Sequence, residues 1–252
     1  MIATIGIPAQ GDIQLMATTS PLTVTSEDVT FPGSSVPTLR GLLARPDASH
    51  GEGPFPALVI IHEAYGLTEN IRDIARRFAD QGYVALAVDL FAGRNQMLCM
   101  ARFMGGMFTN SLEHGGIQDL KSTLTYLAAQ PGVDGGRLGA VGYCMGGSFA
   151  IAWASVDNRL KAIAPYYGFN PRPMAAVERL CPVVGSYPEK DFTAGMGRKL
   201  DSKLTELKID HDIKVYPEAH HSFFNDQGRA YDPAAAKDSW ERVLAFFQGH
   251  IR

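Results

Sequence analysis

The sequence lacks the cysteine patterns that mark several classes of protein. Its 252 residues contain only three cysteines, and they stand far apart, at Cys99, Cys144 and Cys181. An odd number of widely spaced cysteines fits neither a disulfide framework nor a zinc knuckle, and the lack of a Cys-x-x-Cys pair excludes the usual dithiol chemistry. We therefore expect no metal and no other cofactor, and any cysteine with a special role is expected to act through its own reactivity.

Long hydrophobic runs and an excess of basic charge are also missing. The longest apolar stretches, 56–61 and 83–88, fall far short of the roughly 20 residues that cross a bilayer. The formal net charge is −3, and Lys and Arg form no cluster. The first twenty residues lack the basic and apolar regions of a secretory signal. We expect a cytoplasmic monomer or small homo-oligomer with no membrane or nucleic-acid partner, in which residues 1–20 form an N-terminal extension and 21–252 a single domain.

Segments of strand length alternate with segments of helical period along the chain. Two strand-like segments, 22–31 and 36–44, flank the turn-forming Pro32-Gly33-Ser34-Ser35 and predict an antiparallel pair. Further strands are expected at 57–62, 83–89, 138–143, 162–166, 183–187 and 212–216, and helices at 70–81, 117–130, 145–155, 197–208 and 233–248. This alternation predicts a doubly wound, mostly parallel α/β sheet with helices on both faces. Ligands of such sheets bind beyond the carboxyl ends of the strands.

Residues 95–108 are rich in methionine. Met97, Met100, Met104 and Met107 are spaced as one face of a helix, although Gly105-Gly106 weakens a helical interpretation. The stripe either packs against the core or forms an adaptable wall of an apolar pocket.

The strongest local motif is Gly142-Tyr143-Cys144-Met145-Gly146-Gly147, which lies between a predicted strand and a predicted helix. A glycine-flanked elbow in this context lifts its central side chain above the end of the sheet. The helix N-terminus favours a thiolate at Cys144, and the N–H of Met145 points to where an oxyanion would form. The alternative is a buried cysteine in a glycine-rich turn.

A thiol nucleophile needs a base, and candidates follow in the order nucleophile, acid, histidine. Asp191 comes shortly after one predicted strand, and His220-His221 come after the next. A loop aspartate is more often simply solvated, and a single histidine means little by itself. Their order along the chain nevertheless favours a Cys-His-Asp triad in which only one of the two histidines is the base.

Several motifs together resemble the dienelactone hydrolase family over about residues 22–247. They are the elbow, His62-Glu63-Ala64-Tyr65-Gly66, Asp89-Leu90-Phe91, Asp191 and His221-Ser222-Phe223. The resemblance implies an α/β-hydrolase fold and a cysteine nucleophile at Cys144. It also selects His221 rather than His220 as the base.

The resemblance gives further residues a role. Family members carry a glutamate at the position of Glu63 that contacts the resting thiol, and the following N–H, here that of Ala64, contributes to the oxyanion hole. Such a carboxylate would keep the thiol neutral until substrate displaces it, and would so act as a gate. The alternative is a surface glutamate paired with Arg72 or Arg76. Tyr143, next to the nucleophile, is expected to contribute to substrate binding or gating.

Arg94 lies near the family arginine that grips a substrate carboxylate, although the intervening Gly93 shifts the alignment by one place. The alternative is a solvated loop arginine. A second family arginine is missing, because residues 224–226 read Phe-Asn-Asp. This departure weakens the expected carboxylate site, and Arg229 could substitute from farther along the loop.

The favoured function is hydrolysis of an activated ester or lactone, a small-molecule substrate, through a thioester intermediate. A broad-range carboxylesterase acting on short acyl or aryl esters remains open, because the arginine pattern differs from that of the family. A third interpretation, from another class, is a thiol redox or small-molecule-binding protein without hydrolysis. The presence of Asp191 and His221 in triad order argues against it.

Overall fold

A computed structural model describes residues 24–109 and 111–252, so the expected extension at 1–20 lies outside the described residues. One eight-stranded sheet organises the molecule, in the order β1-β2-β4-β3-β5-β6-β7-β8. The strands are β1 (Thr25–Phe31), β2 (Leu39–Arg45), β3 (Phe55–Ile61), β4 (Val84–Asp89), β5 (Val133–Tyr143), β6 (Leu160–Tyr166), β7 (Val183–Lys190) and β8 (His211–His220).

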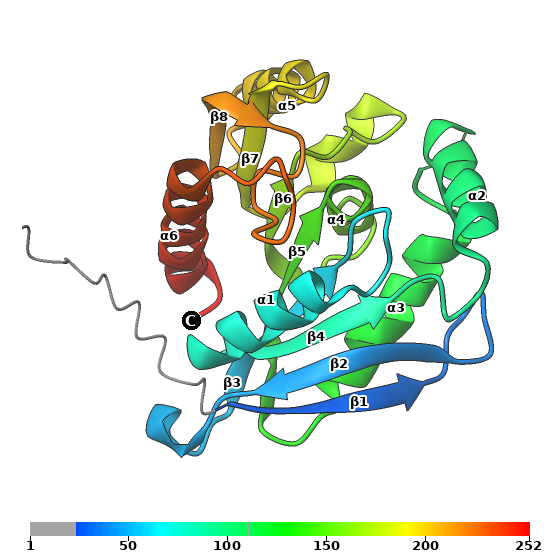
Figure 1. Cartoon of the computed structure of the whole chain (residues 1–252), viewed down its shortest axis with the longest axis vertical. Coiled ribbons are helices and arrows are strands. Elements are labelled where there is room, and N and C mark those ends of the chain that lie inside the picture. The colour runs from blue at the N-terminus through cyan, green and yellow to red at the C-terminus, as the bar shows by residue number, and fades with distance from the viewer. Residues whose placement is uncertain (1–23, 110) are drawn as a thin grey trace, which may run out of the picture.

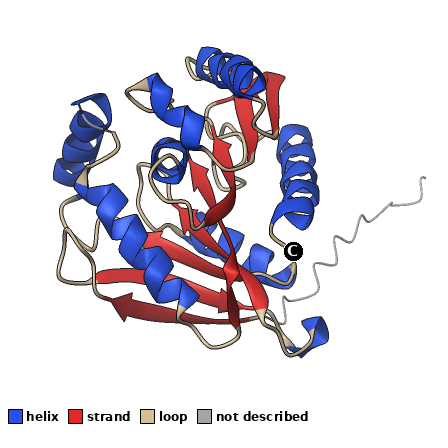
Figure 2. Ribbon diagram, turned by 180° about the vertical axis from the view of Figure 1, so that it is seen from behind, coloured by secondary structure: helices blue, strands red, loops and turns tan. Residues whose placement is uncertain are grey.

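Helices cover both faces of this sheet. The α-helices are α1 (Glu69–Asp80), α2 (Gln96–Thr109), α3 (Gly115–Ala128), α4 (Met145–Ala154), α5 (Ala194–Leu207) and α6 (Pro233–His250), and the short 3-10 helices are η1 (Ala48–His50) and η2 (Met174–Arg179). α1 and α6 pack on one face and lie in front of the sheet in Figure 1. α3, α4 and α5 pack on the other face, which is seen from behind in Figure 2. The fold therefore confirms the predicted doubly wound α/β arrangement.

The strand directions follow the prediction as well. β1 pairs antiparallel with β2, and β2 antiparallel with β4, whereas β4 with β3 and every further neighbouring pair, from β3 with β5 to β7 with β8, are parallel. The central strands are buried on both faces, and their side chains are mostly Val, Ile, Leu and Ala, as expected of a covered parallel sheet. β7 and β8 run three and four residues farther than predicted, because their pairing continues to the register pair Lys190 and His220.

The turn between β5 and α4 fits only because glycines line it. A Cβ atom on Gly142 would lie 2.1 Å from the carbonyl oxygen of Gly146, and one on Gly146 would lie 2.3 Å from that of Ile61. The main chains of β3, β5 and the start of α4 are therefore in direct contact, with no room for a side chain between them. This packing holds the first turn of α4 at the carboxyl end of the sheet.

The methionine-rich segment is helical, but its methionines are not uniformly part of the core. α2 buries Cys99 and Phe103, and Met100 packs partly against the core. Met97 is 81% exposed, so the core interpretation is wrong for that residue, and the side chains of Met104 and Met107 lie outside the described part of the structure. Among the described residues no helix is both long and apolar enough to cross a membrane.

We predict opposite effects for two glycine substitutions. Gly146→Ala should lower the free energy of unfolding by about 1–3 kcal/mol, because the new methyl group overlaps the Ile61 carbonyl. Gly195→Ala, within the first turn of α5 where no atom lies within 4 Å of the added Cβ, should be neutral or stabilising by up to about 1 kcal/mol. Urea unfolding followed by circular dichroism measures both. Equal stability of the two variants would contradict the close packing at the elbow.

Candidate functional site

Cys144 lies at the apex of the turn between β5 and α4. Its backbone has φ 55° and ψ −115°, a strained conformation for a residue with a side chain. Its N–H donates to the carbonyl of Tyr166 at 3.0 Å, which ties the elbow to the end of β6. Met145 is the first residue of α4, so its N–H has no partner within the helix. The sulfur therefore lies half-buried at a helix N-terminus, as expected for a reactive thiol.

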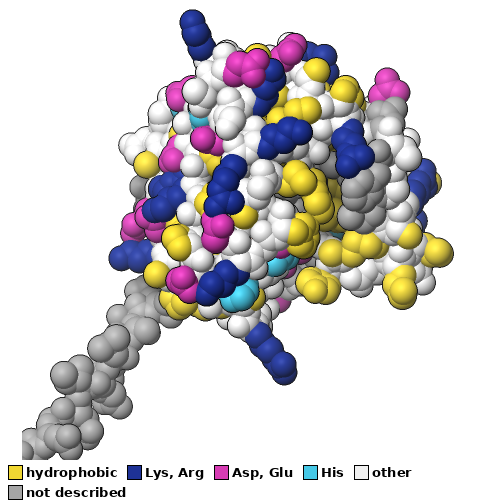
Figure 3. Space-filling model, turned by 90° about the horizontal axis from the view of Figure 1, so that it is seen from above, with side chains coloured by type: hydrophobic (Ala, Val, Ile, Leu, Met, Phe, Trp, Pro, Cys, Tyr) yellow, Lys and Arg dark blue, Asp and Glu magenta, His cyan; other side chains and the backbone are white. Residues whose placement is uncertain are grey.

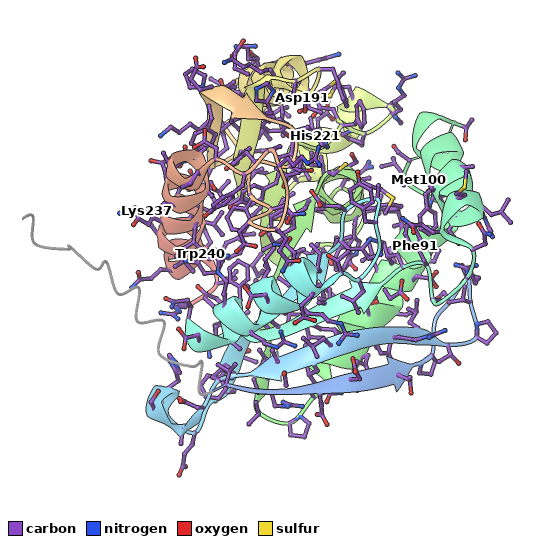
Figure 4. All side chains as sticks on the ribbon, viewed as in Figure 1. Phe91, Met100, Asp191, His221, Lys237 and Trp240 are labelled. Carbon is purple, nitrogen blue, oxygen red and sulfur yellow. The ribbon has the colours of Figure 1, made fainter. Side chains whose placement is uncertain are left out.

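Asp191 and His221 face each other where β7 and β8 end (Figure 4). His221 Nδ1 donates to Asp191 Oδ2 at 2.6 Å, and Thr193 Oγ1 donates to the same oxygen at 2.6 Å. Lys190 pairs with His220 in the parallel register, so the residues that follow them in sequence meet across the two strands. His220 itself is exposed. Of the two adjacent histidines, His221 is the one that contacts the carboxylate.

The imidazole of His221 is held on several sides. Its ring stacks on Phe192 at a centroid distance of 5.7 Å and tilts against Tyr167 at 4.9 Å. Burial disfavours its protonated form, but the hydrogen bond and charge of Cys144, together with Asp191, outweigh burial and raise the pKa of His221 to about 9. An imidazolium beside the sulfur stabilises a thiolate, which is the nucleophilic form.

Glu63 is buried, with 4% exposure, and is bound from the loop after β8. Its Oε1 accepts from Ser222 Oγ at 2.7 Å and from the Tyr167 hydroxyl at 3.4 Å, and its Oε2 accepts from Asn225 Nδ2 at 3.3 Å. The alternative of a surface glutamate paired with an arginine is therefore wrong. Arg72 and Arg76 pair instead with other carboxylates of the described surface.

His62 joins the loops that follow β3 and β4. Its Nδ1 donates to the carbonyl of Glu63 at 2.5 Å, and its Nε2 accepts from the N–H of Leu90 at 3.1 Å. Burial lowers the pKa of His62, although the Glu63 carbonyl and Asp89 act in the opposite direction, so the neutral ring is favoured. Ala64, two residues after His62, accepts from Gln96 Nε2 at 2.8 Å through its carbonyl, which orients the backbone of this loop.

The other expected site residues lie in different surroundings. Tyr143 is 1% exposed and stacks on Tyr166 in the core beneath the elbow, so its ring is closed to solvent. Arg94 is exposed and donates through Nε to the carbonyl of Phe91 at 3.1 Å. Arg229 is exposed in the loop after β8.

Sequence reasoning missed the residues that hold the histidine and Glu63. Thr193 and Phe192 follow Asp191 directly, and a search of the residues beside the acid could have proposed both. Tyr167 and Asn225 carry no motif that predicts their contacts, because these depend on how the loops after β6 and β8 meet. Phe192 is 67% exposed although it stacks on the histidine.

The surface around this end of the molecule is apolar in part. Figure 3 shows hydrophobic side chains gathered around a hollow in the face seen from above.

Among the residues that the structure describes, no group of three or more His, Cys, Asp or Glu side chains could hold a metal ion.

Comparison with known proteins identifies the family. The family model of the dienelactone hydrolases matches residues 39–251. A Saccharolobus solfataricus protein provisionally named carboxymethylenebutenolidase is 31% identical, over 83% of this chain and 93% of its own length. A Yersinia pestis protein with the same provisional name is 31% identical, over 84% of this chain and 84% of its own length.

Solved structures agree with these relatives. A Klebsiella pneumoniae protein provisionally named dienelactone hydrolase superposes with a TM-score of 0.78 at 27% identity, covering 89% of this chain and 98% of that one. The dienelactone hydrolase of Anabaena variabilis shares the fold, with a TM-score of 0.71 at 18% identity and coverage of 91% and 99%. The chain therefore belongs to the dienelactone hydrolase family.

Proposed function

We propose that this chain hydrolyses an activated ester or an enol lactone through a thioester on Cys144, with His221 as the base and Asp191 orienting the imidazole. The observation that carries the proposal is the 2.6 Å hydrogen bond between His221 and Asp191, formed by an imidazole whose pKa Cys144 helps to raise. A histidine held between a carboxylate and a nucleophile is what acyl transfer requires. The relatives named carboxymethylenebutenolidase support a lactone substrate.

The proposed reaction has two halves. The thiolate of Cys144 attacks the carbonyl carbon, and the N–H groups of Met145 and Ala64 stabilise the resulting oxyanion. His221 donates its proton to the leaving oxygen as the C–O bond breaks, which leaves a thioester. Neutral His221 then takes a proton from water, the hydroxide attacks the thioester carbonyl, and Cys144 leaves as the thiolate while the carboxylic acid is released.

The sulfur nucleophile limits the substrate class. A thiolate leaves a tetrahedral intermediate more readily than an alkoxide does, so acylation goes forward when the substrate's own leaving group is good. Enolates and phenolates meet this condition, and amines do not. We therefore propose enol lactones and aryl esters as small-molecule substrates of a cytoplasmic enzyme.

A broad-range carboxylesterase is the second candidate, and two contacts favour it. Asn225, in the region where the family has a second arginine, donates to Glu63 rather than presenting a cation. Arg94 donates to backbone carbonyls of the loop that it follows.

Gating by Glu63 would require its carboxylate to move from Ser222 toward the thiol.

The two adjacent histidines give a direct test of the assignment. His221→Ala should lower kcat for phenyl acetate by about 10³-fold or more, because base assistance and imidazolium stabilisation disappear together. His220→Ala, the matched control, should lower kcat by less than about tenfold. Asp191→Asn should also be severely impaired, because His221 loses the acceptor that fixes its tautomer. If the His220→Ala protein is inactive and the His221→Ala protein keeps its activity, the base is His220 and the assignment to His221 is wrong.

The raised pKa of His221 predicts a pH effect that does not depend on turnover. Cys144→Ala removes the hydrogen bond and the charge that favour protonated His221, so the pKa of His221 should fall from about 9 while the Asp191 contact remains. Because the pKa of His221 is raised above its usual value of 6.5, protonated His221 stabilises the fold most below pH 6.5, and this stabilisation is lost as the pH rises through about 9. Imidazole NMR titration of the wild type and the variant measures the shift. An unchanged midpoint would argue against a thiolate–imidazolium pair.

A further inference from the structure

The buried imidazole of His62 contacts the peptide group that carries the proposed oxyanion N–H. His62 follows the last residue of β3, and the residue is 0% exposed. Its Nδ1 lies 2.5 Å from the carbonyl oxygen of Glu63, and the N–H on the other side of the same peptide bond belongs to Ala64. No step of the proposed reaction uses the ring itself.

The contacts of the ring assign its tautomer. Its Nε2 lies 3.1 Å from the backbone nitrogen of Leu90, and a ring nitrogen that faces an N–H group has to accept. The Asp89 carboxylate, 4.0 Å from Nε2, is too distant for a hydrogen bond that would favour a proton there. Burial lowers the pKa of His62 and so favours the neutral ring. The single proton is therefore on Nδ1, which donates to Glu63.

This hydrogen bond sets the direction of the Ala64 N–H. A peptide group is planar and trans, so an imidazole that holds the Glu63 oxygen turns the Ala64 N–H away from the ring. Ala64 is half-buried, and its N–H has no acceptor within residues 24–109 and 111–252. A donor bonded to the carbonyl also polarises the peptide group and strengthens its N–H as a donor. The N–H is thus both oriented and open to a developing negative charge.

The ring is fixed by its neighbours. Phe91 tilts against it at a centroid distance of 4.8 Å, and the N–H of Leu90 holds Nε2. The backbone of His62 packs on the first turn of α4, because a Cβ atom on Gly146 would lie 2.8 Å from the His62 carbonyl oxygen. Gly146 is two residues from Cys144, so the imidazole and the elbow belong to one packed unit.

We infer that His62 is a positioning residue for the oxyanion hole, and that it orients the Ala64 N–H through the carbonyl of Glu63. This inference rests on the proposed function, because it assumes an oxyanion at that N–H. The contribution appears in the transition state, where negative charge develops, and not in the binding of the neutral ester. Loss of the contact should therefore lower kcat and leave KM nearly unchanged.

Two amide substitutions separate the two contacts of the ring. Counted from Cβ, the amide nitrogen of asparagine is as many bonds away as Nδ1, and the amide oxygen of glutamine is as many as Nε2. His62→Asn should therefore keep the contact with Glu63 and hold kcat for phenyl acetate within about tenfold of the wild type. His62→Gln should keep the contact with Leu90, lose that with Glu63, and lower kcat by about 10²-fold.

The order of the two variants distinguishes positioning from packing. Asparagine leaves the larger void, so a merely structural role makes His62→Asn the more damaging change in both stability and activity. His211→Gln is the matched control and should keep the wild-type kcat and KM. The ring of His211 also lies between a backbone carbonyl at 2.7 Å and a hydroxyl at 3.2 Å, those of Ile209 and Thr205. It lies at the start of β8, however, whereas His221 follows the end of that strand.

A measurement on the wild type covers the case in which a variant does not fold. Long-range ¹H–¹⁵N spectra of protein labelled with ¹⁵N-histidine should show a proton on Nδ1 of His62 and none on Nε2. A proton on Nε2 would overturn the inference. It would also be overturned by a folded His62→Gln protein whose kcat equals or exceeds that of His62→Asn, or by a loss confined to KM.

Cys144→Ala decides the proposed function separately. If that variant keeps its turnover, the thioester mechanism is wrong. If Cys144→Ala is inactive and His62→Gln is unimpaired, only the positioning role of His62 is contradicted.

Discussion

The parallel pairing of β7 with β8 is the constraint on which the candidate site depends. Lys190 and His220, the last residues of β7 and β8, lie opposite each other. The residue after each strand therefore reaches the same point beyond the sheet, and a 2.6 Å hydrogen bond joins Asp191 to His221. A shift of one residue in this register would bring His220 or a neighbouring side chain to the carboxylate instead. Thr193, which donates to the same aspartate oxygen, fixes the carboxylate from the start of α5.

The elbow supplies the other half of the site under a similar constraint. Cys144 adopts a positive φ, which costs of the order of 1–3 kcal/mol for a residue with a side chain. The fold tolerates this strain because the glycines of the turn let its backbone meet β3, and because the end of β6 accepts a hydrogen bond from the Cys144 N–H. Strain stored at one residue thus places the sulfur at a helix N-terminus and toward the imidazole.

Much of this arrangement could be predicted from sequence. The alternation of strands and helices, the antiparallel pair at the N-terminus and the order of Cys144, Asp191 and His221 all follow from local patterns. The contacts of Glu63 could not be predicted in this way. Its partners Ser222, Asn225 and Tyr167 come from loops that lie side by side only once the sheet is packed.

Trapping of the acyl-enzyme tests the central claim, nucleophilic attack by Cys144, most directly. The protein would be mixed with an aryl ester that deacylates slowly, quenched in acid, and analysed by intact mass and peptide mass spectrometry. The account predicts one acyl group per chain on the peptide that contains Cys144, formed in step with phenol release and absent in Cys144→Ala. Phenol release with the acyl group on another residue, or at an unchanged rate in Cys144→Ala, would contradict it.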